Sequence, residues 1–370
     1  MSRVGYLMFL VLTSVSLAAV AVLCESTGAA QEKDKANVIT PKIVTTDGVR
    51  LNVAFYPSPK KNSPTVIMLH PVGIDEGIHK PGWKTLAATL QKNHYSVAIF
   101  DFRGHGESKS IEEPADFWKM NVKGIKKATK EGDTIDVKDY VKSSAYAPVL
   151  VNDITAVKVF LDKRNDTGEC NTGNTVVIGA ESGATLGALW INSQWNCFKY
   201  VAPTPFAKPL IDKRAEGNDV VAAVWLNMQA TVATRQITPS VVLKNACLDR
   251  AMPSAFFFGK DDTKGKDYAK AVVDKLKPKT SKKHDLIMSV EIPGTNLTGV
   301  KLLQKGLPTT DVILEFLDRA VSERNHDWEL RKFDDTAFGW RNPLTKQFLP
   351  AKRKDQKMLR FDTYEQFIAQ

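Results

Sequence analysis

The sequence is poor in the residues that hold metals and cofactors. It has four cysteines and six histidines in 370 residues, and no cysteine or histidine pair has the spacing of metal ligands. It contains no glycine-rich loop that would cradle a phosphate and no internal repeat. We therefore expect no metal and no cofactor. Hydrophobic residues make up 43% and charged residues 25%, which is typical of a globular chain and argues against disorder.

Only the N-terminus carries a long apolar run. Arg3 gives a cationic start, residues 4–24 are almost wholly apolar, and residues 25–31 are small and polar. This order is typical of an export signal, so residues 1–30 are expected to be a signal peptide cleaved after Ala30. An uncleaved membrane anchor is the alternative, because the run approaches the ~20 residues that span a bilayer. The expected location is periplasmic or extracellular.

Export changes the interpretation of the cysteines, because oxidising compartments permit disulfides. Cleavage would leave Cys170, Cys197 and Cys247. Cys170 precedes an expected strand, and Cys197 follows the helix that runs back antiparallel to that strand, so both are expected at one edge of the sheet. We predict a bridge between Cys170 and Cys197, worth roughly 3 kcal/mol in the chain-entropy account. Three unpaired buried thiols are the alternative.

Strands and helices alternate along the chain. Residues 42–55 predict a hairpin around the turn at 46–48. Apolar runs typical of strands buried on both faces lie at 65–69, 96–100, 175–178, 220–226, 255–258 and 286–292. Helical spacing is found at 83–93, 153–164, 182–192, 267–276 and 311–322. The fold class is therefore α/β, with a mostly parallel sheet covered by helices on both faces.

Two segments interrupt this alternation. Residues 109–146 form a polar, lysine-rich insertion after the strand that begins at Ser96, and residues 323–370 form a basic C-terminal extension. The main domain is expected to span residues 31–322. An insertion at this point lies above the carboxyl edge of the sheet, where ligands bind. A lid and a disordered loop are both consistent with its length.

Four motifs resemble those of the α/β-hydrolase superfamily, over about residues 43–322. They are TVIMLHPVG at 65–73, AIFDFRGHGES at 98–108, VVIGAESGA at 176–184 and FFFGKDD at 256–262. The resemblance implies that the first motif supplies an oxyanion-hole amide, with His70 and Val72 at that turn and His105 nearby. It implies that the third motif is the nucleophile elbow and that Asp262 occupies the acid position.

The elbow places a glutamate where the family has its nucleophile. A nucleophile elbow needs very small residues two positions before and after the projecting residue, and Gly179 and Gly183 satisfy this for Glu181. A register shifted by one residue would project Ser182 between Ala180 and Ala184, which makes Ser182 the alternative nucleophile. Ser182 also suits the first turn of a helix, where its hydroxyl can satisfy a free amide.

The general base of the family is missing from its usual place. No histidine occurs at 293–297, and His284 lies at the other end of that strand, roughly 25 Å away. His70, His105 and His326 remain as relocated bases. Without a histidine to orient, Asp262 is better explained as a turn aspartate that caps the next segment.

These residues predict an elbow without acyl-transfer chemistry. We expect an ionised Glu181 that accepts hydrogen bonds from the elbow amides at the helix N-terminus, with a low pKa. A carboxylate nucleophile, as in haloalkane dehalogenases and epoxide hydrolases, would still need a histidine to release its ester. A glycosidase-like pair of Glu181 with Asp262 is conceivable, but nothing in the sequence specifically favours it.

Two function classes follow. The first is a non-catalytic protein of hydrolase fold that binds a small molecule or a protein, and the second is a serine hydrolase, esterase or peptidase-like, that uses Ser182 with a relocated histidine. The net charge of +10 suits an anionic envelope surface. Nucleic acid is not an expected partner, since the basic residues lack a recognisable binding module.

Overall fold

The computed structural model describes residues 36–121, 125, 132–201, 204, 206–208, 210–278, 281–332, 337–342 and 344–350. The expected signal peptide, several lysines of the insertion and residues 351–370 lie outside this set. Residues 36–370 form one compact unit. None of the helices in the described part is long and apolar enough to span a membrane.

A seven-stranded sheet forms the centre of this unit, and it confirms the predicted fold class. Its strand order is β13-β12-β9-β6-β4-β5-β3. The strands are β3 (Val53–Tyr56), β4 (Pro64–Leu69), β5 (Ser96–Phe100), β6 (Asn171–Ala180), β9 (Val220–Leu226), β12 (Ser254–Gly259) and β13 (Ile287–Ile292). All neighbours are parallel except β3, which is antiparallel to β5. β6 is therefore the central strand.

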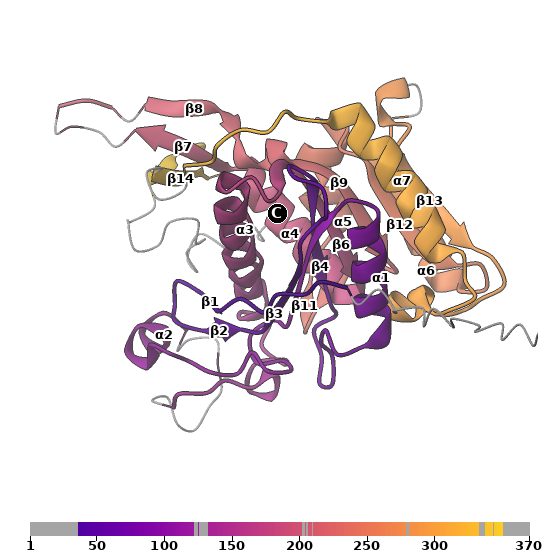
Figure 1. Ribbon diagram of the computed structural model, residues 1–370, viewed down its shortest axis with the longest axis horizontal. Helices are drawn as coiled ribbons and strands as arrows, with labels where there is room; N and C mark the ends of the chain where they lie inside the picture. Colours follow the sequence, from indigo (N-terminus) through magenta and orange to yellow (C-terminus); the bar gives the residue numbers. More distant parts are fainter. Residues whose placement is uncertain are drawn as a thin grey trace, which may run out of the picture. The chain divides into compact units, whose positions relative to one another are not determined.

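Helices cover both faces of this sheet (Figure 1). The longer ones are α1 (Pro81–Lys92), α3 (Val151–Asp166), α4 (Glu181–Trp195), α6 (Thr263–Leu276) and α7 (Thr309–Arg324). Alternate strand residues face two separate cores, so Val177 packs with α3 and α4 whereas Val176 and Ile178 pack with α1 and α7. This alternation explains why the strand runs are continuously apolar.

β6 is longer than the apolar run 175–178 predicted, because its polar beginning is satisfied by the C-terminal extension. The side-chain amide of Asn171 donates to the His326 carbonyl (2.9 Å), and that of Asn174 donates to Asn325 (2.7 Å). Buried polar residues with such partners can extend a strand.

The C-terminal extension also builds a second sheet with a segment from the middle of the chain. The antiparallel order is β15-β14-β7-β8, with β7 (Cys197–Val201), β8 (Leu210–Ala215), β14 (Ala337–Arg341) and β15 (Phe348–Pro350). Arg331 holds the extension in place through an ion pair with Asp219 (3.1 Å) at the main body. These strands were not predicted from the sequence.

The described part of the insertion packs on the hairpin of β1 (Ile43–Val44) and β2 (Arg50–Leu51). Its helix α2 (Pro114–Asn121) ends at Asn121, whose amide donates to Asp47 in the hairpin turn (2.9 Å). The remaining short elements are β10 (Thr231–Val232), β11 (Arg235–Gln236) and α5 (Pro239–Val242).

The predicted disulfide is wrong. Cys170 and Cys197 are both buried thiols that are not joined in a disulfide. The Cys170 thiol faces α3 and contacts the Leu161 carbonyl (3.6 Å). Cys197 instead begins β7 and pairs with Trp340 in the second sheet. The two cysteines therefore belong to different parts of the fold, and a disulfide requires that the two side chains point at each other.

Candidate functional site

The turn between β6 and α4 is sharp and tightly packed. Glu181 has a φ of +49°, in the left-handed region that non-glycine residues rarely adopt. A Cβ on Gly179 would lie 2.6 Å from the Ala184 Cα, and one on Gly183 would lie 2.2 Å from the His70 carbonyl oxygen. Neither glycine has room for a side chain. The strained, projecting residue of this turn is Glu181.

Ser182 is the next residue and lies inside the first turn of α4. Only 4% of its surface is exposed. Its hydroxyl oxygen accepts a hydrogen bond from the Val72 N–H (2.8 Å). Val72 belongs to the HPVG turn, whose resemblance implied an oxyanion-hole amide. The Ser182 hydroxyl therefore takes the Val72 N–H, which is the amide that the resemblance assigns to the oxyanion hole.

The Glu181 carboxylate makes a different contact from the predicted one. Its Oε1 accepts a hydrogen bond from the Thr298 hydroxyl (3.4 Å), and no described backbone amide donates to it. Burial raises the pKa of Glu181, and the Thr298 hydrogen bond and Lys301 only partly oppose this effect. The prediction of an amide-bound Glu181 with a low pKa is wrong, because Ser182 takes the Val72 amide and the carboxylate turns toward the loop after β13.

That loop is where the resemblance places the catalytic histidine. In this chain the loop brings Thr298 to the elbow residue instead. Gly299, with a φ of +54°, follows directly, and a Cβ there would lie 2.4 Å from the Glu181 Oε1. The loop backbone therefore lies against the Glu181 carboxylate, and position 299 has no room for a side chain.

His70 and His105 use both ring nitrogens on backbone groups. In His70, Nδ1 donates to the Pro71 carbonyl (2.6 Å) and Nε2 accepts from the Phe102 N–H (3.0 Å). In His105, Nδ1 faces the Arg103 carbonyl (3.1 Å) and Nε2 accepts from the Gly73 N–H (3.2 Å). Burial lowers the pKa of both, which keeps these imidazoles neutral. They hold the turns together.

The more distant histidines are engaged in the same way. Nε2 of His284 bonds the Leu248 carbonyl (2.8 Å), and that of His326 bonds the Asn218 carbonyl (3.2 Å). In the described part of the chain no hydrogen bond joins an imidazole to Glu181 or Ser182. A general base must come within hydrogen-bond reach of the proton it takes, so none of these contacts provides one.

Asp262 caps a helix. It is the N-cap residue of α6, where its carboxylate accepts from the Gly265 N–H (3.0 Å) and from the Asn227 side-chain amide (2.7 Å). Both carboxylate oxygens therefore have partners, as expected of a capping aspartate.

A pocket of ≈ 890 Å³ opens beside the elbow. Its polar lining includes two carboxyl groups, a hydroxyl and three lysines, from Glu76, Glu181, Thr298, Lys80, Lys301 and Lys305. Its apolar lining includes Pro71, Pro81, Val300, Leu303 and Leu307. Oε2 of Glu76 is buried without a hydrogen-bond partner. Burial and the nearby Glu181 raise the pKa of Glu76, against the opposing effect of Lys80. The pocket thus contains two carboxyl groups with few partners.

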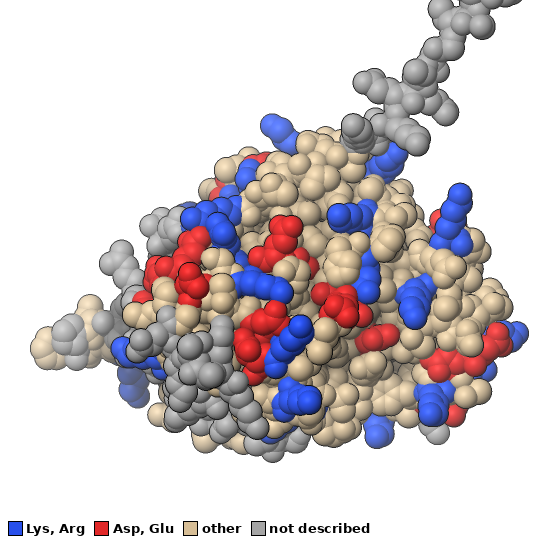
Figure 2. Space-filling view, turned by 90° about the horizontal axis from the view of Figure 1, so that it is seen from below, with Lys and Arg blue, Asp and Glu red and all other residues tan. Residues whose placement is uncertain are grey.

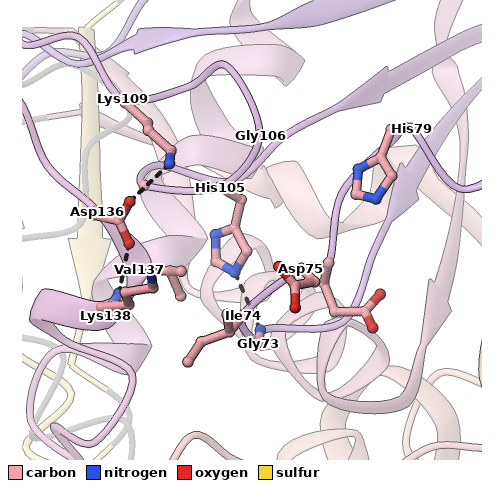
Figure 3. A pocket seen from close by; sticks show the side chains of 12 residues that line it. Gly73, Ile74, Asp75, His79, His105, Gly106, Lys109, Asp136, Val137 and Lys138 are labelled. Atoms are coloured by element: carbon pink, nitrogen blue, oxygen red, sulfur yellow. Dashed lines mark hydrogen bonds and ion pairs between the residues drawn. The ribbon is translucent and has the colours of Figure 1, made fainter.

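A second, smaller pocket of ≈ 230 Å³ (Figure 3) shares Glu76 with the first. The 3₁₀ turn that begins at Val137, in the predicted insertion, forms one wall, and His105 and His79 lie on the opposite side. Lys109 and Asp136 form an ion pair (2.7 Å) at its edge. Glu76 and His79 were not among the predicted site residues, because they occupy an irregular turn that matches no motif.

The chain is similar to several solved structures with which it shares little sequence identity. No family model matches the chain, and no curated protein matches it. Among solved structures, a dienelactone hydrolase from Anabaena variabilis is 11% identical, with a TM-score of 0.46 over 78% of this chain and 97% of that one. The esterase Pf2001 of Pyrococcus furiosus is 16% identical, with a TM-score of 0.48 over 76% and 91%.

A third solved structure, DcsB in complex with its substrate analogue, is 13% identical, with a TM-score of 0.49 over 77% of this chain and 100% of that one. These values are too low to carry any of those activities to this chain. The architecture rests on its own geometry: a mostly parallel sheet, helices on both faces, and a strained turn after the central strand. This arrangement is that of an α/β-hydrolase fold.

Proposed function

We propose that this protein uses an α/β-hydrolase fold to bind a small molecule and has no serine-hydrolase activity. The observation that carries the proposal is the contact between Glu181 and Thr298. A carboxyl group stands at the projecting position of the elbow, and a threonine hydroxyl meets it where the resemblance calls for an imidazole.

The surrounding hydrogen bonds support the same conclusion. Acyl transfer needs a nucleophile, a base that takes its proton, and donors aimed at the oxyanion. The Ser182 hydroxyl faces an amide donor rather than a base, and the ring nitrogens of His70 and His105 are committed to backbone groups. An ester formed on Glu181 would lack the histidine-activated water that releases it.

The pocket suggests which ligands it takes. Glu76 has a buried acceptor oxygen without a hydrogen-bond partner, and Glu181 has one long hydrogen bond, from Thr298. Both carboxyl groups lie beside an apolar wall that includes Val300 and Leu303, and lysines line the same pocket. Buried polar groups without partners are costly, and a ligand that pairs them gains affinity. A small molecule with an ammonium or hydroxyl group on an apolar body fits this lining.

Activity-based labelling tests the absence of hydrolase chemistry. A fluorophosphonate probe is expected to leave the wild-type chain and Ser182→Ala equally unlabelled, while it labels an added serine hydrolase in the same tube. Labelling of the wild type that disappears in Ser182→Ala would establish the active serine hydrolase instead.

A matched pair of ligands tests the pocket. Thermal unfolding is measured with n-hexylamine and with n-hexanoate, which share an apolar chain and differ in charge. The amine is expected to raise the Tm, and Glu181→Gln with Glu76→Gln is expected to abolish the shift. Stabilisation by hexanoate alone would contradict the assigned polarity of the pocket.

We also propose that the chain is exported, on the strength of the cationic, apolar and small-residue order of residues 1–30. N-terminal sequencing of the protein recovered from its native cell is expected to begin at Gln31. A sequence that begins at Met1 or Ser2, in the membrane fraction, would indicate the uncleaved anchor.

A further inference from the structure

The β7–β8 hairpin of the second sheet reaches away from the main body (Figure 1). Its strands pair in register so that Val201 lies opposite Leu210, at the start of the connecting segment. β8 is the edge strand of this sheet. Val201 and Leu210, the described residues at this end of the two strands, are both exposed.

This tip exposes apolar side chains to an unusual degree. Phe206 is 99% exposed, Leu210 is 74% exposed and Val201 is 65% exposed. Nine large apolar side chains are exposed in the described part of the chain, and these three lie between positions 201 and 210. A concentration of this kind marks an interaction site, whereas isolated exposed apolar residues need no explanation.

Basic side chains accompany the apolar tip. Lys208 and Lys213 are exposed, and no ion pair among the described residues involves either one. Asp212 is the only acidic residue between 199 and 214, and its carboxylate accepts the Arg214 N–H (2.9 Å). The face seen in Figure 2 differs, since basic and acidic side chains are interspersed over it. The tip combines apolar reach with unmatched positive charge.

Two other occupants fit the tip less well. Addition of a partner strand needs backbone N–H donors, but positions 203, 205 and 209 in the connecting sequence are prolines, which have none. A stable dimer buries roughly 800 Å² on each partner, far more than three side chains on a narrow hairpin supply.

We propose that the tip of the β7–β8 hairpin docks on an anionic membrane surface. Phe206, Val201 and Leu210 enter the boundary between headgroups and acyl chains, and Lys208 and Lys213 meet the lipid phosphates. Amphipathic elements bind interfaces through apolar burial together with attraction to anionic lipids. This docking is independent of the ligand pocket beside Glu181.

Vesicle flotation tests the proposal. The protein used in this experiment begins at Gln31, so that residues 1–30 do not contribute to vesicle binding. Residues 36–370 form one compact unit, so the shortened protein is expected to fold. Vesicles of phosphatidylcholine alone are compared with vesicles that also contain phosphatidylglycerol. Binding is expected only with phosphatidylglycerol, and is expected to weaken as salt screens the lysines.

Matched variants locate the contact. Phe206→Asp is expected to lower the partition coefficient about tenfold or more, while Val241→Asp, at an exposed position on α5, leaves it unchanged. Lys208→Gln with Lys213→Gln is expected to lower it about fivefold per lysine, while Lys264→Gln with Lys270→Gln on α6 does not. Wild-type binding by Phe206→Asp overturns the proposal. So does a Phe206→Asp effect that follows the loss of a dimer in sedimentation.

Discussion

Two clusters of charged side chains lie close to the carboxyl edge of the sheet, and they differ in how fully their charges are paired. Around Arg103, which is fully buried, Asp153 and Asp47 accept from the guanidinium at 2.6 Å each, and Tyr146 adds a further partner (3.1 Å). At the elbow, Glu181 has one hydrogen bond of 3.4 Å, and Glu76 has a buried oxygen with none.

The difference separates structural charge from candidate functional charge. Burying an ion is tolerable where each partner is paired, and the Arg103 cluster meets that condition while it joins the β1–β2 hairpin, α3 and the motif turn. At the elbow carboxyls, the Thr298 hydrogen bond and the nearby Lys301 and Lys80 offset the cost of burial only in part. Such imperfect sites are retained at functional positions more often than elsewhere.

The largest effect is expected from breaking the paired cluster. Arg103→Met leaves Asp47 and Asp153 buried without their cation, so the free energy of unfolding should fall by about 3–5 kcal/mol. Urea denaturation of the variant measures it. Arg319→Met is the matched control, because Arg319 forms an exposed pair with Glu323 (3.5 Å) and should change stability by less than about 0.5 kcal/mol. Equal effects of the two substitutions would remove the distinction between the clusters.

The main sheet and the position of Glu181 could be predicted from local sequence. The strands of the main sheet were predicted because continuous apolar runs such as 220–226 and 96–100 are local signals of burial on both faces. The strained position of Glu181 followed from the spacing of Gly179 and Gly183, since the steric demand of a sharp turn is also local.

The parts that the sequence left out depend on partners remote in the chain. β7 pairs with β14 across more than a hundred residues, and neither segment has a distinctive pattern of its own. The state of Glu181 depends on which side chain reaches the Val72 amide, and Ser182 does so. Cys170 precedes β6 of the main sheet, whereas Cys197 begins β7 of the second sheet, so the two thiols face different neighbours. The spacing of residues along the sequence does not determine which way a side chain points at a tertiary contact.

A smaller effect should come from the tight packing that holds the elbow in place. Gly183→Ala brings a Cβ against the His70 carbonyl oxygen, and we expect a loss of about 1–3 kcal/mol in the free energy of unfolding. Gly73→Ala is the control, since its Cβ would lie 3.5 Å from the Glu76 side chain, an ordinary contact. If Gly183→Ala proved neutral in urea denaturation, the elbow backbone would be free to relax, and Glu181 would not be held in its strained position.

The smallest effect concerns the elbow carboxyl itself and gives the comparison its sign. Burial raises the folded-state pKa of Glu181 above its ordinary value of 4.5, so the folded chain holds this proton more tightly than the unfolded chain does. The resulting stability is present below the ordinary value and is lost as pH rises through the raised one. Glu181→Gln should therefore raise the Tm at about pH 8 and give no gain at about pH 4.

Because the site is partly open to solvent, this gain should be about 1 kcal/mol or less. Glu76→Gln should act in the same direction, since the nearby Glu181 contributes to its raised pKa. The double variant should gain less than the sum of the single ones, because either substitution already removes their mutual repulsion. Glu323→Gln, which removes a carboxylate that pairs with Arg319 on the exposed face of α7, is the control and should change the Tm little. A Tm at about pH 8 that falls in Glu181→Gln would mean that the carboxylate is held by favourable partners, and the contrast with Arg103 would disappear.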